Sequence, residues 1–344
     1  MDARGPIFII GTQGSGSTLL RLMLDSHEQI AIPQETGFMR AYNAHQWIPF
    51  KWSGRNWAKR LGWSREELDE ELAAFYDRLF RRYAEGLGKR RWGDKTPYHT
   101  FHVDNMARMF PDAVFIAIIR HPAATVASNR SRFGHSLKRT TLQYFRYNKE
   151  IARQSAQRPD RIAVLRYEEL VLRPEPALRQ LLDWLGEPWS DSVLSHHEVQ
   201  PGRGGRLEVE GRNRRDDPVD PSRIAKWERT LDASTRATVE RELGRIGEFY
   251  GYSMSDAMAL APLRPDGALV VGGADIEARI DAFPDLDLLT PVEVPNADRL
   301  YNPGRLGLRT VQRAPGRGPA PESAPATADG PRRLLAAARR AIGG

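Results

Sequence analysis

Short apolar segments alternate along this chain with longer segments in which apolar residues recur at helical spacing. Three of the short segments, at residues 7–10, 113–119 and 162–165, are fully apolar and rich in β-formers, which is typical of parallel strands buried on both faces. Weaker strand patterns occur at residues 29–32 and 92–96. The alternation predicts a three-layer α/β domain with a mainly parallel central sheet. Helices are expected over residues 17–26, 64–85, 101–110, 123–132, 175–185 and 234–250.

The helix expected over residues 64–85 has the clearest start signal. Ser64 and Glu67 have the spacing of a capping box, in which the hydroxyl and the carboxylate each accept a backbone N–H of the first turn. The segment is therefore predicted to be an amphipathic helix. Its apolar residues at helical spacing are Leu68, Leu72, Phe75, Leu79 and Tyr83.

Past residue 252, Pro, Gly, Ala and Arg become the dominant residues. Residues 314–331 approach low complexity. A strand-like run at residues 268–271 and a basic helix around residues 332–342 are the only ordered elements expected in this part. We therefore predict two regions: a domain at residues 1–254, which holds every motif described below, and a partly disordered C-terminal extension at residues 255–344.

The net charge is +7, from 51 Lys and Arg against 44 Asp and Glu, and all of this excess lies in the first 254 residues. A basic domain favours an anionic ligand or substrate, although a mildly basic surface without a specific partner explains the charge equally well. No zinc-finger, homeodomain or RNP pattern occurs in the sequence, so no nucleic acid partner is predicted.

The absence of cysteine excludes disulfides, thiolate catalysis and Cys-ligated zinc or iron–sulfur clusters. No cluster of His and Asp has metal-binding spacing, so no metal is predicted. The apolar run at residues 7–10 is too short for the core of a signal peptide, and no segment approaches the roughly 18 apolar residues of a membrane span. We therefore expect a cytoplasmic protein without a membrane span.

A glycine-rich loop, Gly-Thr-Gln-Gly-Ser-Gly-Ser-Thr at residues 11–18, lies between the first predicted strand and the first predicted helix. Glycines let the backbone approach an anion, and the N-terminus of the following helix adds positive potential. The spacing is that of a P-loop, except that Ser17 replaces the lysine that would neutralise a nucleoside triphosphate. A glycine-rich turn that binds nothing is the alternative. The residues predicted to bind phosphate are Gln13, Gly14, Ser15, Gly16, Ser17 and Thr18.

A second candidate anion site follows the strand at residues 113–119. Arg120 comes directly after this strand, where open α/β sheets place ligand contacts, and Ser128 and Arg132 lie in the helix that follows. Guanidinium groups bind phosphate bidentately, so these three side chains predict a phosphate site. A surface arginine with a capping role is the ordinary alternative. Tyr167, after the next predicted strand, is equally compatible with a core position.

The glycine-rich loop resembles that of the sulfotransferases that use 3′-phosphoadenosine 5′-phosphosulfate (PAPS), and the bacterial and tyrosylprotein members are the most similar. In that family residues matching 9–21 bind the 5′-phosphosulfate, with Ser or Thr at the position of Ser17. One departure occurs at Gly14, where the family has a Lys or Arg that stabilises the leaving group. The resemblance extends over residues 6–252, and it implies the same α/β fold and the same donor.

The second motif resembles the 3′-phosphate site of the same family, because the spacing of Arg120 and Ser128 and the position of Arg132 all match. Residues 166–170, Arg-Tyr-Glu-Glu-Leu, are similar to a family segment whose tyrosine lies in the nucleotide site. The resemblance therefore implies that Tyr167 also binds the nucleotide.

The resemblance also implies two catalytic residues. Glu35, just after the second predicted strand, matches the catalytic glutamate of the tyrosylprotein enzymes and would take the proton of the acceptor hydroxyl. Lys95, in the sequence Gly-Asp-Lys-Thr-Pro, matches a lysine that reaches the sulfuryl group, and it would supply the cation that Gly14 lacks. Solvated surface charges are the alternative for both. His99 and His102 are alternative bases, with His102 expected on a solvent-facing helix turn.

Two further features are less specific. Arginines recur through residues 203–215, where the family has a mobile loop over the nucleotide, but a solvated basic loop explains them equally well. Tryptophans recur through residues 47–63, which suits an apolar or ring-bearing acceptor or simply the anchoring of helices.

The predicted function is transfer of the sulfuryl group of PAPS to a hydroxyl of a small-molecule or natural-product acceptor, free or bound to a carrier, with adenosine 3′,5′-bisphosphate as the product. Two alternatives remain open: a P-loop kinase, which Ser17 opposes, and a non-catalytic nucleotide-binding module, which Gly14 favours. The oligomeric state is not predicted.

Overall fold

The structure is a computed structural model that describes residues 5–42, 45, 60, 62–199 and 219–292. Outside the described residues lie the arginines at 203–215, the side chains of Trp47, Trp52 and Trp57, the low-complexity residues 314–331 and the basic helix expected at 332–342.

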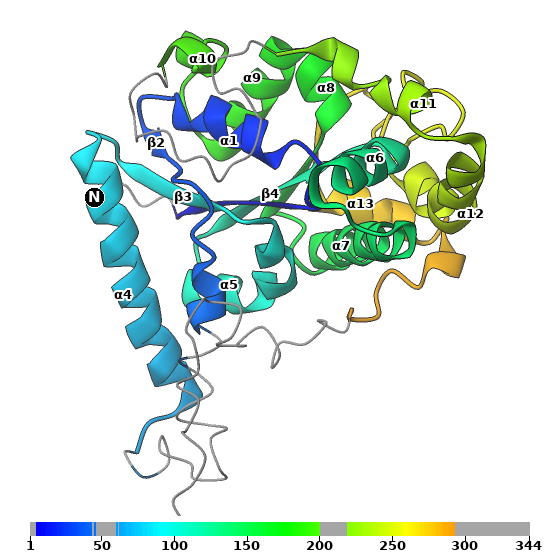
Figure 1. The fold of residues 1–344 in the computed structure, drawn as a ribbon. Helices are drawn as coiled ribbons and strands as arrows, with labels where there is room; N and C mark the ends of the chain where they lie inside the picture. The colour runs from blue at the N-terminus through cyan, green and yellow to red at the C-terminus, as the bar shows by residue number, and fades with distance from the viewer. Residues whose placement is uncertain (1–4, 43–44, 46–59, 61, 200–218, 293–344) are drawn as a thin grey trace, which may run out of the picture. The chain divides into compact units, whose positions relative to one another are not determined.

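Six strands of the described residues form one sheet in the order β2-β3-β1-β4-β5-β6 (Figure 1). The first five are parallel, and β6 pairs antiparallel with β5. The strands β1, β4 and β5 are buried almost throughout because helices cover both of their faces, as their unbroken apolar runs predict. The bounds are β1 Ile7–Gly11, β2 Ile30–Ala31, β3 Arg91–Lys95, β4 Val114–Ile119, β5 Ile162–Arg166 and β6 Val270–Gly272.

Helices lie on both faces of the sheet, which confirms the predicted three layers. In Figure 1, α1 and α9 lie over one face, whereas α7 and α13 lie over the other. Each strand and helix predicted before residue 254 is confirmed to within two residues. The helices are α1 Ser17–Asp25, α4 Arg65–Gly86, η2 Pro97–His102, α5 Val103–Met109, α6 Pro122–Phe133, α7 Leu137–Gln157, α8 Tyr167–Leu172, α9 Pro174–Leu185, η3 Asp191–Val193, α10 His196–Val199, η5 Pro221–Arg223, α11 Lys226–Thr230, α12 Ala233–Phe249, α13 Gly273–Ile280 and η6 Pro284–Leu286.

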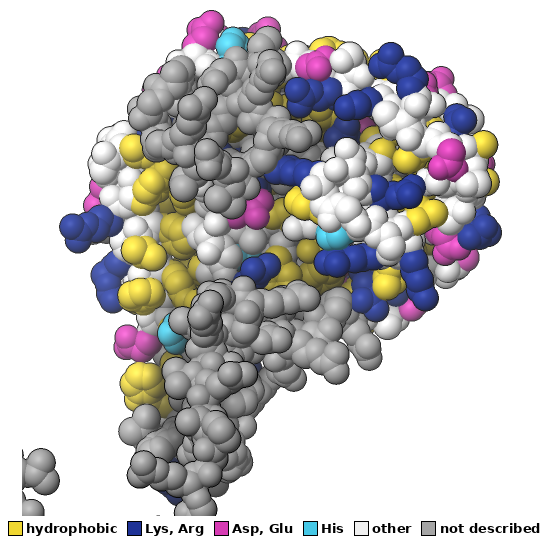
Figure 2. All heavy atoms as spheres, in the orientation of Figure 1, with side chains coloured by type: hydrophobic (Ala, Val, Ile, Leu, Met, Phe, Trp, Pro, Cys, Tyr) yellow, Lys and Arg dark blue, Asp and Glu magenta, His cyan; other side chains and the backbone are white. Residues whose placement is uncertain are grey.

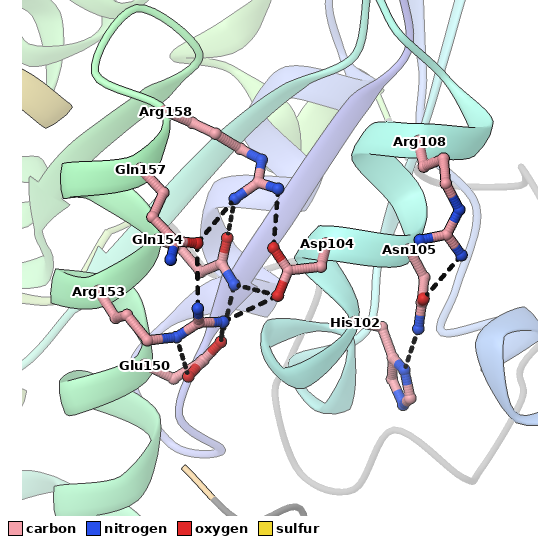
Figure 3. Close-up of polar contacts among 9 residues, drawn as sticks. All are labelled: His102, Asp104, Asn105, Arg108, Glu150, Arg153, Gln154, Gln157 and Arg158. Carbon is pink, nitrogen blue, oxygen red and sulfur yellow. Dashed lines mark hydrogen bonds and ion pairs between the residues drawn. The ribbon is translucent and has the colours of Figure 1, made fainter. Parts of the chain in front are cut away.

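The helix α7 occupies residues for which the apolar pattern predicts no element. Its buried face is largely polar and includes Glu150, Arg153 and Gln154. Figure 3 shows that Arg153 Nη2 lies 2.7 Å from Glu150 Oε1 and 2.8 Å from Asp104 Oδ2 of α5. Arg158 of the same network lies 2.7 Å from the other oxygen of Asp104. Because its charges are paired, α7 buries a polar face that hydrophobic periodicity does not reveal.

The sheet continues beyond the boundary predicted at residue 254. The strand β6 pairs with β5, with Val271 opposite Val164, and α13 packs against α7. Val271 and Ile276 of this segment are fully buried. Residues 255–292 therefore belong to the sheet domain rather than to an extension. The strand expected at residues 268–271 is thus present as β6, but neither its pairing with β5 nor the eight-residue helix α13 is apparent in the Pro- and Gly-rich sequence around it.

Ending the chain after residue 254 should destabilise the protein, because it uncovers the edge of β5 and the face of α7 against which α13 packs. We expect insoluble protein, or a Tm lower by about 10 °C or more, since several buried apolar side chains are lost. A chain ending after residue 292 is the matched control and should melt like the full-length chain. Thermal unfolding followed by circular dichroism would contradict this if the shorter chain melted like the longer one.

Candidate active site

The β1–α1 loop, residues 11–18, follows the path that the P-loop spacing predicts. Gly14 and Gly16 have φ values of 84° and 98°, a left-handed conformation that favours glycine. A Cβ added to Gly16 would lie 2.2 Å from the ring of Tyr167, so no side chain fits there. The helix α1 begins at Ser17, directly after this turn, so its first backbone N–H groups and its positive end adjoin the loop.

Side-chain amides from two helices hold this loop in place. Asn129 of α6 donates from Nδ2 to the carbonyl oxygen of Gln13 at 2.7 Å. From α7, Gln143 donates to Gln13 Oε1 at 3.2 Å, and Asn148 donates to Thr12 Oγ1 at 3.2 Å. The amino-acid sequence does not reveal these amides, because no local pattern places α7 beside the loop. Of the three amides, only that of Asn129 could have been suspected from the sequence, because Asn129 directly follows Ser128 of the predicted phosphate site.

Arg120 lies where β4 ends and reaches across to the loop. Its Nη1 donates to the carbonyl oxygen of Gly14 at 3.1 Å, and its guanidinium lies 4.2 Å from the centre of the Tyr167 ring. Ser128 is also at the loop, because a Cβ added to Gly14 would lie 3.3 Å from Ser128 Oγ. The two predicted anion motifs therefore meet at Gly14.

Arg132, the third predicted member of the phosphate site, lies near the end of α6 and is exposed. Its guanidinium is 5.2 Å from the ring of Phe133. Its participation in phosphate binding stays a prediction.

The predicted catalytic pair lies on the other side of the loop. Lys95, at the end of β3, is buried, and its Nζ lies 2.6 Å from Oε1 of the exposed Glu35. The same Nζ donates to Thr18 Oγ1 at 3.3 Å. Tertiary structure thus brings together a carboxylate, an ammonium group and the first turn of α1, which are distant in sequence.

The segment that carries Glu35 is tied to β3 by a buried carboxylate. Thr36 donates from Oγ1 to Asp94 Oδ1 at 2.6 Å, and His99 Nδ1 lies 3.0 Å from Asp94 Oδ2. Burial alone would raise the pKa of Asp94, but His99 and the hydroxyls of Thr36 and Thr96 together hold it below its ordinary value. Asp94 is therefore a charged anchor directly behind the Lys95–Glu35 pair.

Both histidines considered as alternative bases are buried. His102 is not on a solvent-facing turn as predicted, and burial lowers its pKa to about 3. His99 contacts Asp94, and its ring lies 4.9 Å from that of Phe38. The prediction for His102 is wrong because η2 and α5 turn that side chain towards the interior. Burial of this kind depends on tertiary packing and not on local spacing.

A neutral histidine supports the helix that carries Ser128. His121 is buried at the start of α6, and its Nδ1 accepts the backbone N–H of Ala123 at 3.1 Å. Its ring stacks on Trp227 at a centroid distance of 4.7 Å. Burial lowers the pKa of His121 to about 4, although the carbonyl oxygen of Ser253 opposes this shift. The imidazole is therefore neutral at pH 7 and can act as a hydrogen-bond acceptor at the helix start.

Lys and Arg side chains gather on the half of the visible surface that holds α6 and α7 (Figure 2). This distribution agrees with the excess of basic residues in the first 254 residues. Within the described residues, no three His, Asp or Glu side chains are arranged to hold a metal ion. No helix in the described part of the chain is long and apolar enough to cross a membrane.

An α/β domain with a glycine-rich anion loop after its first strand is of the P-loop-like class. Residues 6–191 match the family described as the Sulfotransferase family. Protein-tyrosine sulfotransferase 1 of Danio rerio is 30% identical over 257 residues, which are 70% of this chain and 71% of that protein. Protein-tyrosine sulfotransferase 1 of Homo sapiens is 30% identical over 237 residues, which are 64% of this chain and 62% of that protein.

Solved structures show the same fold. The sulfotransferase domain of the Synechococcus PCC 7002 olefin synthase has a TM-score of 0.52 at 21% identity, covering 74% of this chain and 98% of that domain. The sulfotransferase domain from the curacin biosynthetic pathway has a TM-score of 0.50 at 21% identity, covering 74% and 99%. The chain belongs to the sulfotransferase family, and it is a sulfotransferase enzyme. The predicted resemblance to this family is confirmed, and the P-loop kinase alternative is not.

The neutral state of His121 should make stability depend on pH. The folded-state pKa of about 4 lies below the ordinary value of 6.5. Neutral His121 therefore stabilises the folded state in full above pH 6.5, and this stabilisation is lost as the pH falls to about 4. We expect this residue alone to account for a loss of about 3 kcal/mol in the free energy of unfolding over that range. The substitution His121→Asn keeps a helix-capping acceptor but does not titrate, so its loss should be smaller. Urea unfolding between pH 7 and pH 4 gives both curves, and equal slopes would contradict the expectation.

Proposed function

We propose that this enzyme transfers the sulfuryl group of PAPS to a hydroxyl group of a small-molecule or natural-product acceptor, free or bound to a carrier. The proposal rests on the arrangement of two groups of side chains around the loop. Arg120 and Ser128 lie beside Gly14 at one side of the loop, and the Lys95–Glu35 pair lies beside the first turn of α1 at the other. These two groups suit a donor that has a 3′-phosphate at one end and a phosphosulfate at the other.

The residues present fit this donor. Ser15 Oγ is buried and has no hydrogen-bond partner among the described residues, and the same holds for Arg120 Nε. A buried polar atom without a partner is costly unless a ligand or water completes it. The N–H groups of the loop and of the α1 N-terminus would hold the 5′-phosphosulfate, and Arg120 with Ser128 would hold the 3′-phosphate. Tyr167, against which Arg120 stacks, would border the nucleotide.

The Lys95–Glu35 pair supplies the two charges that the reaction requires. Glu35 would take the proton of the acceptor hydroxyl as its oxygen bonds to sulfur and the bond from sulfur to the phosphate oxygen breaks. The negative charge then stays on adenosine 3′,5′-bisphosphate, where Lys95 stabilises it. Because Gly14 provides no cation, Lys95 would take over that task. Its hydrogen bond to Thr18 places it at the loop, where the donor would lie.

A second candidate for the acceptor is a tyrosine of a protein or peptide. The relatives that are 30% identical to this chain over roughly two thirds of its length carry that substrate in their names. One experiment separates the two. The enzyme and PAPS are incubated with a metabolite extract and with tyrosine peptides, and mass spectrometry identifies which molecules gain a sulfuryl group. The absence of any such product from both would overturn the proposal. The cytoplasmic location stays a prediction.

If Arg120 holds the 3′-phosphate, Arg120→Ala should weaken the binding of adenosine 3′,5′-bisphosphate by about 1.5–3 kcal/mol, the usual loss for a hydrogen bond to a charged group. Adenosine 5′-phosphosulfate, which lacks that phosphate, should bind both proteins almost equally. Isothermal calorimetry provides the measurement, with Arg139→Ala, an exposed arginine of α7, as the matched control. Unchanged binding of the bisphosphate to Arg120→Ala would show that the phosphate lies elsewhere.

If Glu35 is the base, Glu35→Gln should lower turnover by roughly 10²–10⁴-fold while donor affinity changes little. Thr36→Val should also lower turnover, because it removes the hydrogen bond from Thr36 to Asp94 that ties the segment carrying Glu35 to β3. Thr36→Ser keeps the hydroxyl and serves as the control. In the Glu35→Gln background, Thr36→Val should have no further effect, since both act through one carboxylate. Near-normal turnover of Glu35→Gln would remove this residue from the mechanism, and additive losses would show that Thr36 acts independently of it.

A further inference from the structure

Tyr144 of α7 holds the main chain of Arg120 at the point where β4 ends. Its Oη donates to the carbonyl oxygen of Arg120 at 2.8 Å, and the side chain is buried. Burial, together with the neighbouring Glu168 and Tyr250, raises the pKa of this hydroxyl well above its usual range, so it keeps its proton and stays a donor. Arg120 and His121 lie between β4 and α6 and belong to neither element. A side chain from a third element therefore holds the chain at this junction.

A second buried side chain holds the same peptide group from its other end. The backbone N–H of His121 donates to Glu168 Oε1 of α8 at 3.0 Å, and Tyr252 donates to the other oxygen of Glu168 at 2.8 Å. The carbonyl group of Arg120 and the N–H of His121 belong to one planar peptide unit. Because β4 fixes the chain before this unit, the two hydrogen bonds restrict the direction in which the Arg120 side chain leaves the main chain.

The guanidinium end of Arg120 is held as well. Its Nη1 and Nη2 each donate at 3.1 Å to a carbonyl oxygen, those of Gly14 and Arg223, whereas its buried Nε has no hydrogen-bond partner among the described residues. An arginine that is fixed at both ends loses little conformational freedom when it binds a phosphate. A displacement of its main chain would move the guanidinium away from the loop and weaken this binding.

The face of α7 that carries Tyr144 also holds the glycine-rich loop. Asn148, one turn further along α7, donates to Thr12 Oγ1, and Gln143 donates to Gln13 Oε1. The amide of Asn148 also donates to the carbonyl oxygen of Tyr144 at 2.8 Å. One helix is therefore bonded both to the loop after β1 and to the end of β4. Because a helix is rigid over a single turn, it fixes the spacing between these two parts of the proposed donor site.

We propose that Tyr144 is a positioning residue for donor recognition, which acts through the Arg120 carbonyl group to hold the guanidinium at the distance from the loop that a 3′-phosphate requires. Tyr144 itself does not touch the donor. The inference rests on the proposed function, because it takes the 3′-phosphate of the donor as the ligand of Arg120.

Two nucleotides that differ only in the 3′-phosphate test this role. Isothermal calorimetry gives the dissociation constants of adenosine 3′,5′-bisphosphate and adenosine 5′-phosphate, and the preference for the bisphosphate measures recognition of the 3′-phosphate. Tyr144→Phe removes one hydroxyl and keeps the ring. It should lower this preference by about 3- to 10-fold, the usual effect of one hydrogen bond, while the affinity for adenosine 5′-phosphate stays unchanged.

Tyr250→Phe is the matched control. Tyr250 is also fully buried, and its Oη donates at 2.7 Å to a main-chain carbonyl oxygen of α7, that of Asn148, without reaching Arg120. Both variants lose one buried hydrogen bond and should melt at similar temperatures, but Tyr250→Phe should keep the preference of the wild type. An equal change of preference in the two variants would overturn the role of Tyr144, as would an equal loss of both nucleotides in Tyr144→Phe.

A double variant tests whether Tyr144 acts through Arg120. In the Arg120→Ala background, Tyr144→Phe should not lower the preference further, since the guanidinium that it positions is gone. An additional loss would overturn the inference. A wild type that binds the two nucleotides equally would overturn the proposed donor, and this inference with it. A strong preference in the wild type that Tyr144→Phe retains would leave the donor in place and overturn only the role of Tyr144.

Discussion

The site depends on a contact that leaves no room for a side chain. Gly16 lies so close to the ring of Tyr167 that an added Cβ would overlap it at 2.2 Å. This contact joins the loop after β1 to the helix that follows β5, across the intervening strand β4. Arg120, at the end of β4, then stacks on the same ring and reaches Gly14. Three strand ends therefore converge on one point, and the parallel sheet supplies their common direction.

Polar side chains surround this point, and those described next are paired with one another or with the loop. The helix α7 contributes amides that hold the loop, and it balances its own buried charges through Asp104, Glu150, Arg153 and Arg158 (Figure 3). Buried charges are costly without partners, so the network permits a polar helix to lie against the sheet. The same physical requirement applies to Lys95, which is buried and paired with Glu35. The protein thus keeps charge near the site at limited cost to its stability.

Much of the candidate site could be predicted because its residues lie at strand ends or helix starts that local sequence reveals. Gly14, Gly16 and Arg120 are examples, and the structure brings them together as expected. The supporting amides of α7 could not be predicted, since their partners are more than a hundred residues away. Arg132 was expected beside Ser128 from helical spacing, but spacing alone does not determine where a long, exposed side chain lies.

The sequence by itself determined the α/β class, the parallel strands and the anion loop, because each rests on a local pattern: unbroken apolar runs, helical periodicity or a glycine-rich turn. Tertiary structure decided where the domain ends, since the strand expected at residues 268–271 and the short helix α13 could be assigned to the sheet domain only by what they pack against. It also decided that His102 is buried, whereas Phe75, Leu79 and Tyr83 of α4 stay exposed among the described residues. These are properties of contacts between distant segments, and local periodicity carries no information about which face of an element will find a partner.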